Sequence, residues 1–369
     1  MRVLQTTLLT GPYDWDPAVL PREEFAARLE RVRAVLDGAG IGALLVHGHA
    51  GDYGALNYLT GFVPKLGPAF ALVPREGPIR LVVAGTPLML PWAKRLTWVE
   101  DVRALANLPK LVADWLGDAP AALGSWGAVT MAQGLYRGII GVAGPAGLTP
   151  LDAPLDAIRR HKSPRELHLV RRATRALGLA ASALAAEAGD GNRSAALAAE
   201  RAAVAAGAQD VRVQTSLRPG GTPQPLDGPE DRIVDPLLAA LAVQCGGYWA
   251  AGMLTVAAHR GTALDRAEAA LAAVLAAASP GARADALLDI FVTAIAPLAP
   301  HLLMRSAIGC AIGLSLDEGK LSGDAVLEPG GVYFLRAGAR AGEEDSAIVS
   351  AMIAVTADGV ETLWAALPR

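Results

Sequence analysis

Three residues whose side chains could transfer protons or form a covalent bond lie close together near the end of the sequence. Cys310 follows an apolar stretch that contains His301, and the acidic pair Asp317 and Glu318 comes shortly after it. A thiol beside a general base can act as a nucleophile, and histidine or aspartate can supply that base. The ordinary explanations are a small core cysteine, a hydrogen-bonded histidine and a solvated acidic turn. We predict Cys310, Asp317 and His301 as catalytic candidates.

A second group of candidates lies near the N-terminus. His47 and His49 are two residues apart at the end of an apolar run, so in a strand their side chains face the same side. Two imidazoles without a third ligand are a weak metal signal. The sequence has two cysteines, Cys245 and Cys310, both in apolar surroundings, which argues against a disulfide framework or a cysteine-based zinc site. We predict no metal and no cofactor.

The periodicity of apolar residues predicts the elements that position these side chains. In the first part of the chain, helical and strand-like runs alternate, which is typical of an α/β domain. The predicted elements are helices at 21–40, 104–116 and 130–138, and strands at 41–46, 69–73 and 79–83. We assign residues 1–157 to this domain.

A helix start marks the second domain, residues 158–369. Ser163 is placed as the N-cap, Pro164 at the first helical position and Glu166 three residues after the cap, which together form a capping box. Beyond it, helices alternate with groups of antiparallel strands, which describes an α+β domain. The predicted elements are helices from 164 and at 193–206, 262–278 and 284–298, and strands at 210–217, 237–244, 248–257, 332–340, 347–355 and 362–365.

Several motifs in this order resemble the creatinase/aminopeptidase P (Xaa-Pro peptidase) superfamily. They are the run Asn57–Phe62, the interdomain stretch Arg159–Ala173 with its Lys-Ser-Pro, the strand Gly247–Thr255 and the run Gly309–Leu314. The resemblance covers essentially the whole chain. It implies a creatinase-type α/β N-terminal domain, a pita-bread C-terminal domain with a curved antiparallel sheet, and a homodimer.

The resemblance also places the metal ligands of this superfamily, and here the chain departs from it. Active members hold two metal ions with two aspartates, one histidine and two glutamates. The aspartate positions fall on Ala240 and Ala251, the histidine position on Cys310, and the glutamate positions on Arg336 and Ser350. Methyl groups and a guanidinium have no lone pair for a metal. We therefore expect that the chain is not a dinuclear metallopeptidase.

Creatinase itself uses a histidine instead of a metal, which the resemblance places in the loop 218–231. That loop contains no histidine, so this mechanism cannot be carried over either. Arg336 remains as a catalytic candidate, because a guanidinium can bind a carboxylate or a developing oxyanion. The alternative is a buried ion pair that replaces the metals, with Asp317 or an acidic residue of 343–345 as the partner.

The resemblance suggests four substrate contacts. Tyr248 and Ser350 lie on strands of the expected cavity, and we assign both to substrate binding. His49 and Asp52 are added because the N-terminal domain of this superfamily often reaches the active site of a neighbouring subunit. These contacts are implied by the resemblance and follow from no local pattern of the sequence.

The composition limits the partners. The chain has 369 residues, 52% of them hydrophobic and 19% charged, with a formal net charge of −3. No long run of one charge suggests nucleic acid, no apolar span suggests a membrane, and Met1 to Trp15 show no signal peptide. We expect a cytoplasmic protein that binds a small molecule or a peptide.

The leading hypothesis is a metal-independent, hydrolase-like enzyme that acts on a small amide- or carboxylate-bearing substrate by hydrolysis, elimination or cyclisation. The alternative is an inactive pseudopeptidase that binds peptides or proteins.

Overall fold

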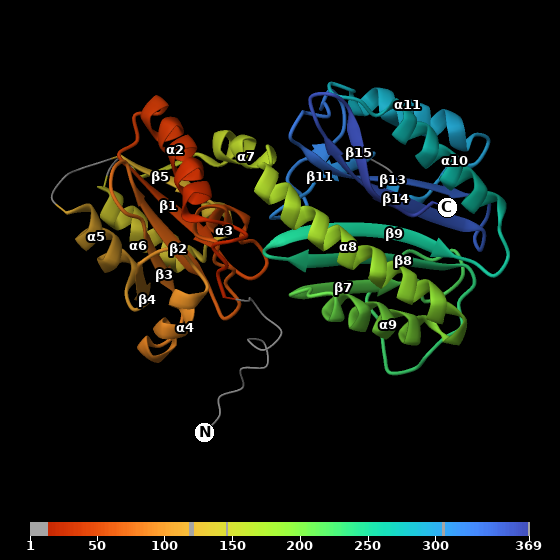
Figure 1. Cartoon of the computed structure of the whole chain (residues 1–369), viewed down its shortest axis with the longest axis horizontal. Coiled ribbons are helices and arrows are strands. Elements are labelled where there is room, and N and C mark those ends of the chain that lie inside the picture. Colours follow the sequence, from red (N-terminus) through yellow and green to blue (C-terminus); the bar gives the residue numbers. More distant parts are fainter. Residues whose placement is uncertain (1–13, 118–121, 145–146, 305–306, 368–369) are drawn as a thin grey trace. The chain divides into compact units, whose positions relative to one another are not determined.

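The computed structural model describes residues 14–117, 122–144, 147–304 and 307–367 (Figure 1). The chain forms two compact units, Met1–Arg159 and Arg160–Arg369, called here the N-terminal and the C-terminal unit. The predicted boundary between residues 157 and 158 and the division between Arg159 and Arg160 both fall within one helix, α7 (Asp152–Arg160). The sequence analysis found no signal peptide in Met1 to Trp15, and residues 1–13 of that stretch lie outside the described residues. In the described part, no helix has the length and hydropathy needed to cross a bilayer.

The N-terminal unit has a mixed six-stranded sheet in the order β4-β3-β2-β1-β5-β6. β1 is antiparallel to β2 and parallel to β5, and all of its residues are buried. The elements are α2 (Arg22–Gly38), β1 (Ala43–Gly48), α3 (Gly54–Thr60), β2 (Ala69–Pro74), β3 (Arg80–Val83), α4 (Leu90–Arg95), β4 (Asp101–Ala104), α5 (Leu108–Leu116), β5 (Leu123–Trp126), α6 (Gln133–Ala143), β6 (Leu148–Pro150) and α7 (Asp152–Arg160). The predicted α/β architecture of this domain is confirmed.

One predicted helix start is wrong. The sequence analysis began a helix at 104, but residues Asp101–Ala104 form strand β4 and the helix begins at Leu108. The Asn107 side chain accepts a hydrogen bond from the Lys110 backbone N–H at 3.1 Å, and Pro109 lies in the first turn. A side-chain cap and an early proline fix the start of a helix more strongly than apolar spacing does.

The C-terminal unit has two groups of antiparallel strands with helices packed on them. One sheet has the order β7-β8-β9 and the other β12-β11-β13-β14-β15, with β10 paired to β13. The elements are α8 (Pro164–Glu187), α9 (Asn192–Ala205), β7 (Asp210–Thr215), β8 (Leu237–Cys245), β9 (Tyr248–Val256), α10 (Thr262–Ala277), α11 (Ala284–Ile295), β10 (Ala299–Pro300), β11 (Gly309–Ala311), β12 (Lys320–Leu321), β13 (Val332–Arg340), β14 (Ser346–Val355) and β15 (Val360–Ala365). The predicted α+β architecture is confirmed, although the short strands β10, β11 and β12 were not predicted.

The predicted capping box at the start of α8 is confirmed. The Ser163 side chain accepts from the Glu166 backbone N–H, and the Glu166 carboxylate accepts from the Ser163 N–H. The other carboxylate oxygen of Glu166 accepts a hydrogen bond from the Tyr248 hydroxyl at 2.9 Å. Because Glu166 and Tyr248 are both fully buried, this contact fixes the start of α8 against the start of β9.

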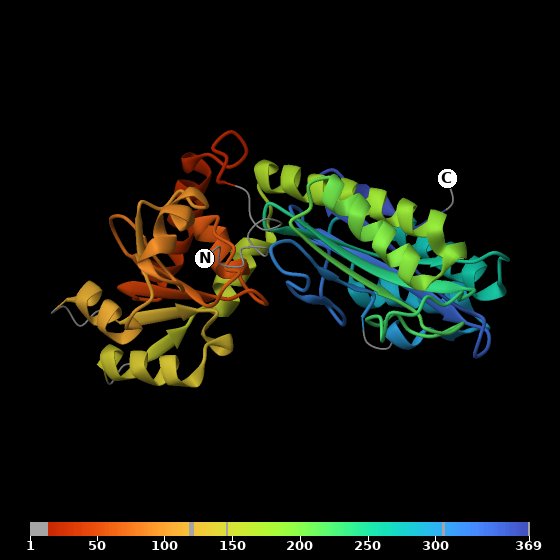
Figure 2. The same ribbon diagram turned by 90° about the horizontal axis from the view of Figure 1, so that it is seen from below.

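Side-chain hydroxyls connect the two groups of strands along β9 and β14. Ser350 Oγ accepts from the Met253 N–H at 2.6 Å and donates to the Met253 carbonyl at 3.2 Å. Thr255 Oγ1 makes the equivalent pair of bonds with the Ile348 backbone, both at 2.9 Å. Helices α8 and α9 cover one face of β7–β9 (Figure 2). The side chains of these strands that point away from the helices form the opposite face of the sheet.

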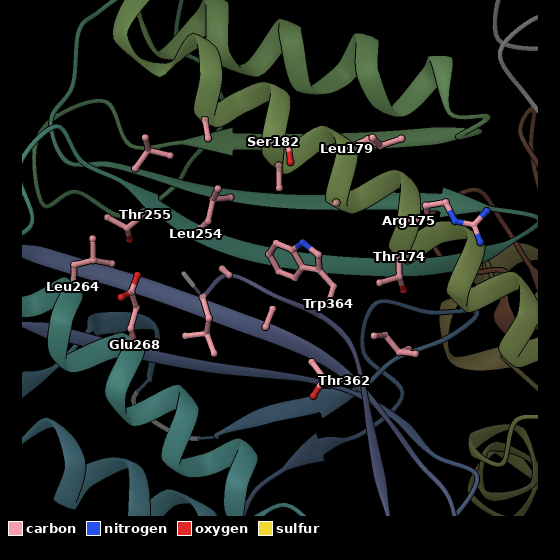
Figure 3. Close-up of a pocket in the computed structure, with 18 of the residues that line it drawn as sticks. Thr174, Arg175, Leu179, Ser182, Leu254, Thr255, Leu264, Glu268, Thr362 and Trp364 are labelled. Atoms are coloured by element: carbon pink, nitrogen blue, oxygen red, sulfur yellow. The ribbon is translucent and has the colours of Figure 1, made fainter. Parts of the chain in front are cut away.

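A hollow of about 1030 Å³ lies on the helix-covered side of β9, between α8, α10 and β15 (Figure 3). Trp364 of β15 stands in this hollow beside α8. A Cβ atom added to Gly252 of β9 would lie 2.8 Å from the Trp364 ring and 3.2 Å from Leu177 of α8. The missing side chain at 252 therefore lets the indole pack directly on the strand.

Gly252→Ala is expected to destabilise the protein by about 1–3 kcal/mol, because the new methyl group has to displace the Trp364 ring. Urea denaturation of the whole chain measures the change. Gly342→Ala is the matched control, since a Cβ atom at Gly342 would meet nothing within 4 Å. Equal stabilities of the two variants would contradict the direct contact between the indole and the strand.

Candidate functional site

A cavity of about 450 Å³ lies in the C-terminal unit. Its floor comes from β7, β8 and β9, and its walls from β11, β13 and the turn before β12. On the floor, Arg212, Ala242 and Ala251 form one cross-strand row, and Gln214, Ala240 and Met253 form the next. Residues opposite one another across antiparallel strands point to the same face. Because three of these six side chains are single methyl groups, the floor leaves room for a ligand.

Arg336 on β13 lines this cavity and is partly buried. Burial lowers its pKa from the usual value, and the neighbouring Cys310 and Asp317 oppose that effect, but an arginine keeps its charge in any protein environment. Its Nε atom is buried and has no hydrogen-bond partner among the described residues. Neither Asp317 nor the described acids at 343–345 form an ion pair with it. A buried donor without an acceptor is costly, and the Arg336 side chain brings a positive charge to the cavity wall.

The turn that carries Asp317 is fixed by a buried ion pair. Lys162 Nζ lies 2.5 Å from a carboxylate oxygen of Glu318, and the two side chains are 2% and 1% exposed. The other oxygen of Glu318 accepts from the Leu314 N–H at 2.9 Å. Asp317 itself is exposed, lines the cavity and accepts from the Gly319 N–H at 3.0 Å. The pair holds the backbone of this turn while the Asp317 carboxylate stays open to the cavity.

A glycine makes the buried pair possible. A Cβ atom added to Gly313 would lie 2.5 Å from Lys162 Cε and 3.0 Å from a Glu318 oxygen. At the other end of the same run, a Cβ atom on Gly309 would lie 2.0 Å from the Phe334 carbonyl oxygen. The two glycines of the run Gly309–Leu314 therefore allow close packing at both ends of the wall that contains Cys310.

Cys310 lines the cavity, but its thiol is protonated. Its Sγ donates to the Leu316 carbonyl at 3.4 Å. Burial, reinforced by the charge of Asp317, raises the pKa of Cys310 to about 12 although Arg336 opposes the shift. A thiol with such a pKa is a poor nucleophile at neutral pH.

Alkylation tests this state. At pH 8 about one Cys310 in ten thousand is a thiolate, so iodoacetamide is expected to modify the native protein at least about a hundredfold more slowly than the urea-unfolded chain. Mass spectrometry of the Cys310 peptide measures the rate. Cys245, whose pKa burial also raises, is the internal comparison. Rapid modification of native Cys310 alone would restore it as a nucleophile.

His301 is buried and is not among the residues that line the cavity. Its Nδ1 accepts from the Leu303 N–H at 3.2 Å. Burial, with smaller contributions from Arg340 and Arg336, lowers the pKa of His301 from 6.5 to about 4. Its site therefore holds a neutral imidazole, and the hydrogen bond gives it a structural role.

The lowered pKa of His301 predicts a loss of stability in acid. The neutral imidazole contributes fully to the free energy of unfolding above pH 6.5. This contribution is lost as the pH falls from 6.5 through about 4, because the unfolded chain binds the proton first. The free energy of unfolding falls by at most about 3 kcal/mol. His301→Asn, which keeps an acceptor near Nδ1, is expected to flatten this part of the pH profile. Urea denaturation at several pH values measures it, with exposed His259→Asn as the control. An unchanged profile in His301→Asn would contradict the buried neutral imidazole.

The structure does not place Tyr248 and Ser350 in the cavity. Both are fully buried, and their hydroxyls bond to Glu166 and to the Met253 backbone. Both hydroxyls therefore have structural partners, and the substrate contacts of Tyr248 and Ser350 stay a prediction. Both partners are far away in the sequence, so no local pattern could reveal them.

His49 and Asp52 lie in the N-terminal unit, just after β1. Their backbones pair with each other, with N–O distances of 2.8 and 3.0 Å, and His49 Nδ1 accepts from the Gly51 N–H. This tight turn explains their spacing. Their contact with a substrate stays a prediction.

Two cationic residues of the cavity were missed by the sequence analysis. Arg212 lies on β7 and Lys320 at the start of β12, and both line the cavity with exposed side chains. Arg212 alternates with apolar residues in its strand, which is the ordinary pattern of a solvated face. Only the register of β7 against β8 shows that this face is the cavity floor.

The donors in the cavity do not fit a dinuclear metal centre. Its described lining has one carboxylate, from Asp317, and one thiol with a pKa of about 12, beside the three cations Arg212, Lys320 and Arg336. In the described part of the chain, no cluster of three histidine, cysteine or acidic side chains could hold an ion. Divalent ions need several anionic or imidazole donors, whereas this lining repels cations.

Solved structures resemble this chain over nearly its whole length. The prolidase from Pyrococcus horikoshii OT3 has a TM-score of 0.74 and 19% identity, covering 91% of this chain and 97% of its own. The dipeptidase PepE from Mycobacterium ulcerans has a TM-score of 0.73 and 20% identity, and the match covers 97% of this chain and 98% of the dipeptidase. The X-Pro aminopeptidase from Thermotoga maritima MSB8 has a TM-score of 0.74 and 18% identity, and the match covers 93% of this chain and 98% of the aminopeptidase.

Comparisons of the sequence alone add nothing to this. No protein-family profile matches it, and no curated protein matches it. At these identities a structural likeness establishes the fold, while the reaction depends on the site. The chain therefore has the two-domain pita-bread fold of prolidases, Xaa-Pro dipeptidases and aminopeptidases P.

Proposed function

We propose that the C-terminal unit is a metal-independent site for a small molecule with a carboxylate or amide group, anchored by Arg336. The observation that supports this most directly is the guanidinium of Arg336, which lines the cavity and forms no ion pair within the described residues. A carboxylate would give the guanidinium the charge-assisted hydrogen bonds that it lacks.

Asp317 is the group we propose for proton transfer. It is the one carboxylate of the described lining, and the backbone beside it is held by Lys162 and Glu318. In a hydrolysis, Asp317 would take a proton from water as the water oxygen bonds to an amide carbon, and would return a proton to the leaving nitrogen. In a substrate whose amide rather than carboxylate lies at Arg336, the guanidinium would stabilise the oxyanion formed in between. An elimination or cyclisation would use the same base.

Turnover assays test the enzyme. The purified chain is incubated with N-acyl amino acids and Xaa-Pro dipeptides, with and without EDTA, and products are followed by mass spectrometry. We expect activity that EDTA leaves unchanged, and at least about a hundredfold loss in Asp317→Asn. Exposed Asp227→Asn is the control. Activity that EDTA abolishes and manganese restores would reject the proposal.

A peptide-binding pseudopeptidase is the second candidate. The methyl groups of Ala240 and Ala251 on the cavity floor and the protonated thiol of Cys310 favour it, because none of them can take part in acid–base chemistry. This candidate predicts peptides that bind without being changed, and binding that survives Asp317→Asn. The resemblance adds the proposal of a homodimer, which sedimentation velocity can test.

A further inference from the structure

Three cations from three different strands surround the cavity. Arg212 lies on β7, Lys320 on β12 and Arg336 on β13, and one carboxylate, Asp317, lines the same cavity in the described chain. Asp317 can balance one of these charges. The described lining therefore keeps an excess of positive charge, which favours an anionic ligand.

Arg212 is held in place by an aromatic ring. Its guanidinium carbon lies 4.6 Å from the centre of the Trp249 ring, and Trp249 is 2% exposed. The ion pair of Arg212 with Asp210 is long, at 3.9 Å, and the Arg212 side chain is 48% exposed. Stacking on a buried ring orients the guanidinium without using its hydrogen-bond donors. Most of these donors remain available to a ligand.

Arg212 and Arg336 stand on different sides of the cavity. Strands β8, β9 and β14 lie between β7, which carries Arg212, and β13, which carries Arg336, since β9 and β14 are joined through Met253 and Ser350. A phosphate is too compact to reach cations on opposite walls, whereas two carboxylates on a short carbon chain can do so. The cavity, at about 450 Å³, is within the usual size of small-molecule sites.

We infer that the cavity takes a small dicarboxylate, with one carboxylate on Arg336 and the second on Arg212, where Lys320 adds positive charge. The inference rests on the proposed function, since it needs Arg336 as the first anchor. Arg212 then determines specificity by distinguishing a dicarboxylate from a monocarboxylate of the same shape.

A matched pair of probes tests this. N-acetylglutamate and N-acetylglutamine have nearly the same shape, but the first has a second carboxylate where the second has an amide. Calorimetric titration at low salt is expected to show about tenfold tighter binding of N-acetylglutamate to the unaltered protein. Arg212→Ala is expected to reduce this preference to within about twofold, by weakening the binding of N-acetylglutamate much more than that of N-acetylglutamine. Arg212→Lys, which keeps the charge but not the flat stacking group, should keep part of it.

Arg201→Ala is the control, because Arg201 is an exposed arginine of α9 that does not line the cavity; it should change neither affinity. A preference that survives intact in Arg212→Ala would overturn the inference, as would inorganic phosphate binding more tightly than N-acetylglutamate. The proposed function fails separately, if Arg336→Ala leaves N-acetylglutamine binding unchanged. No binding of either probe to the unaltered protein would reject both.

Discussion

Replacing Lys162 with methionine is expected to destabilise the C-terminal unit by about 3–5 kcal/mol, since removing one partner leaves a buried charge without its counter-charge. Lys162 and Glu318 are 2% and 1% exposed and lie 2.5 Å apart. Glu318 has backbone donors from the turn 314–315 as well, but these cannot replace a full positive charge. The same substitution should loosen the turn that carries Asp317.

Urea denaturation of Lys162→Met, Glu318→Gln and the double variant Lys162→Met/Glu318→Leu separates the charge from the packing. We expect the double variant to recover much of the loss, because an apolar pair of similar volume leaves no buried charge. Arg171→Met is the control, since its ion pair with Glu361 is 44% and 43% exposed and should cost at most about 1 kcal/mol. A loss in Lys162→Met no larger than that of Arg171→Met would contradict a buried pair.

Arg336→Met is expected to move stability and binding in opposite directions. Methionine keeps most of the length but removes a partly buried cation whose Nε lacks an acceptor among the described residues. The free protein should therefore become about 1–2 kcal/mol more stable. The affinity for N-acetylglutamine should fall at least about a hundredfold, because the buried charge-assisted hydrogen bonds to its carboxylate are lost.

Urea denaturation and calorimetric titration of the same samples measure the two effects, with Arg201→Met as the matched control. A less stable Arg336→Met protein with unchanged affinity would show that the guanidinium serves the fold. That result would support the structural alternative for Arg336 and remove the anchor on which the proposed function depends.

The features that could be predicted from the sequence are those that depend on residues close to one another along the chain. The capping box of Ser163 and Glu166 was found where it was predicted, because a cap and its partner lie within one turn of a helix. The helix start at 104 was wrong because the local signals of Asn107 and Pro109 outweigh the apolar pattern. The two-domain architecture followed from the alternation of periodic runs, which needs no knowledge of contacts.

The candidate site could be predicted only in part. The cavity brings together Arg336, Asp317 and Cys310, as the resemblance led us to expect. The hydrogen bonds of Tyr248 and Ser350 and the place of Arg212 in the cavity were not predicted, because they depend on partners that only the pairing of distant strands brings near. The pKa of Cys310 also depends on burial, which the residue type does not reveal.

The sequence separation of the Lys162–Glu318 pair bears on how this protein is made. The two residues are 156 positions apart, so on the ribosome the lysine emerges long before the carboxylate that it will meet. We expect this contact to form late, because closing so long a segment needs the intervening strands in place. A late contact slows unfolding more than it speeds folding. The pair would then prolong the lifetime of the finished protein rather than guide the nascent chain.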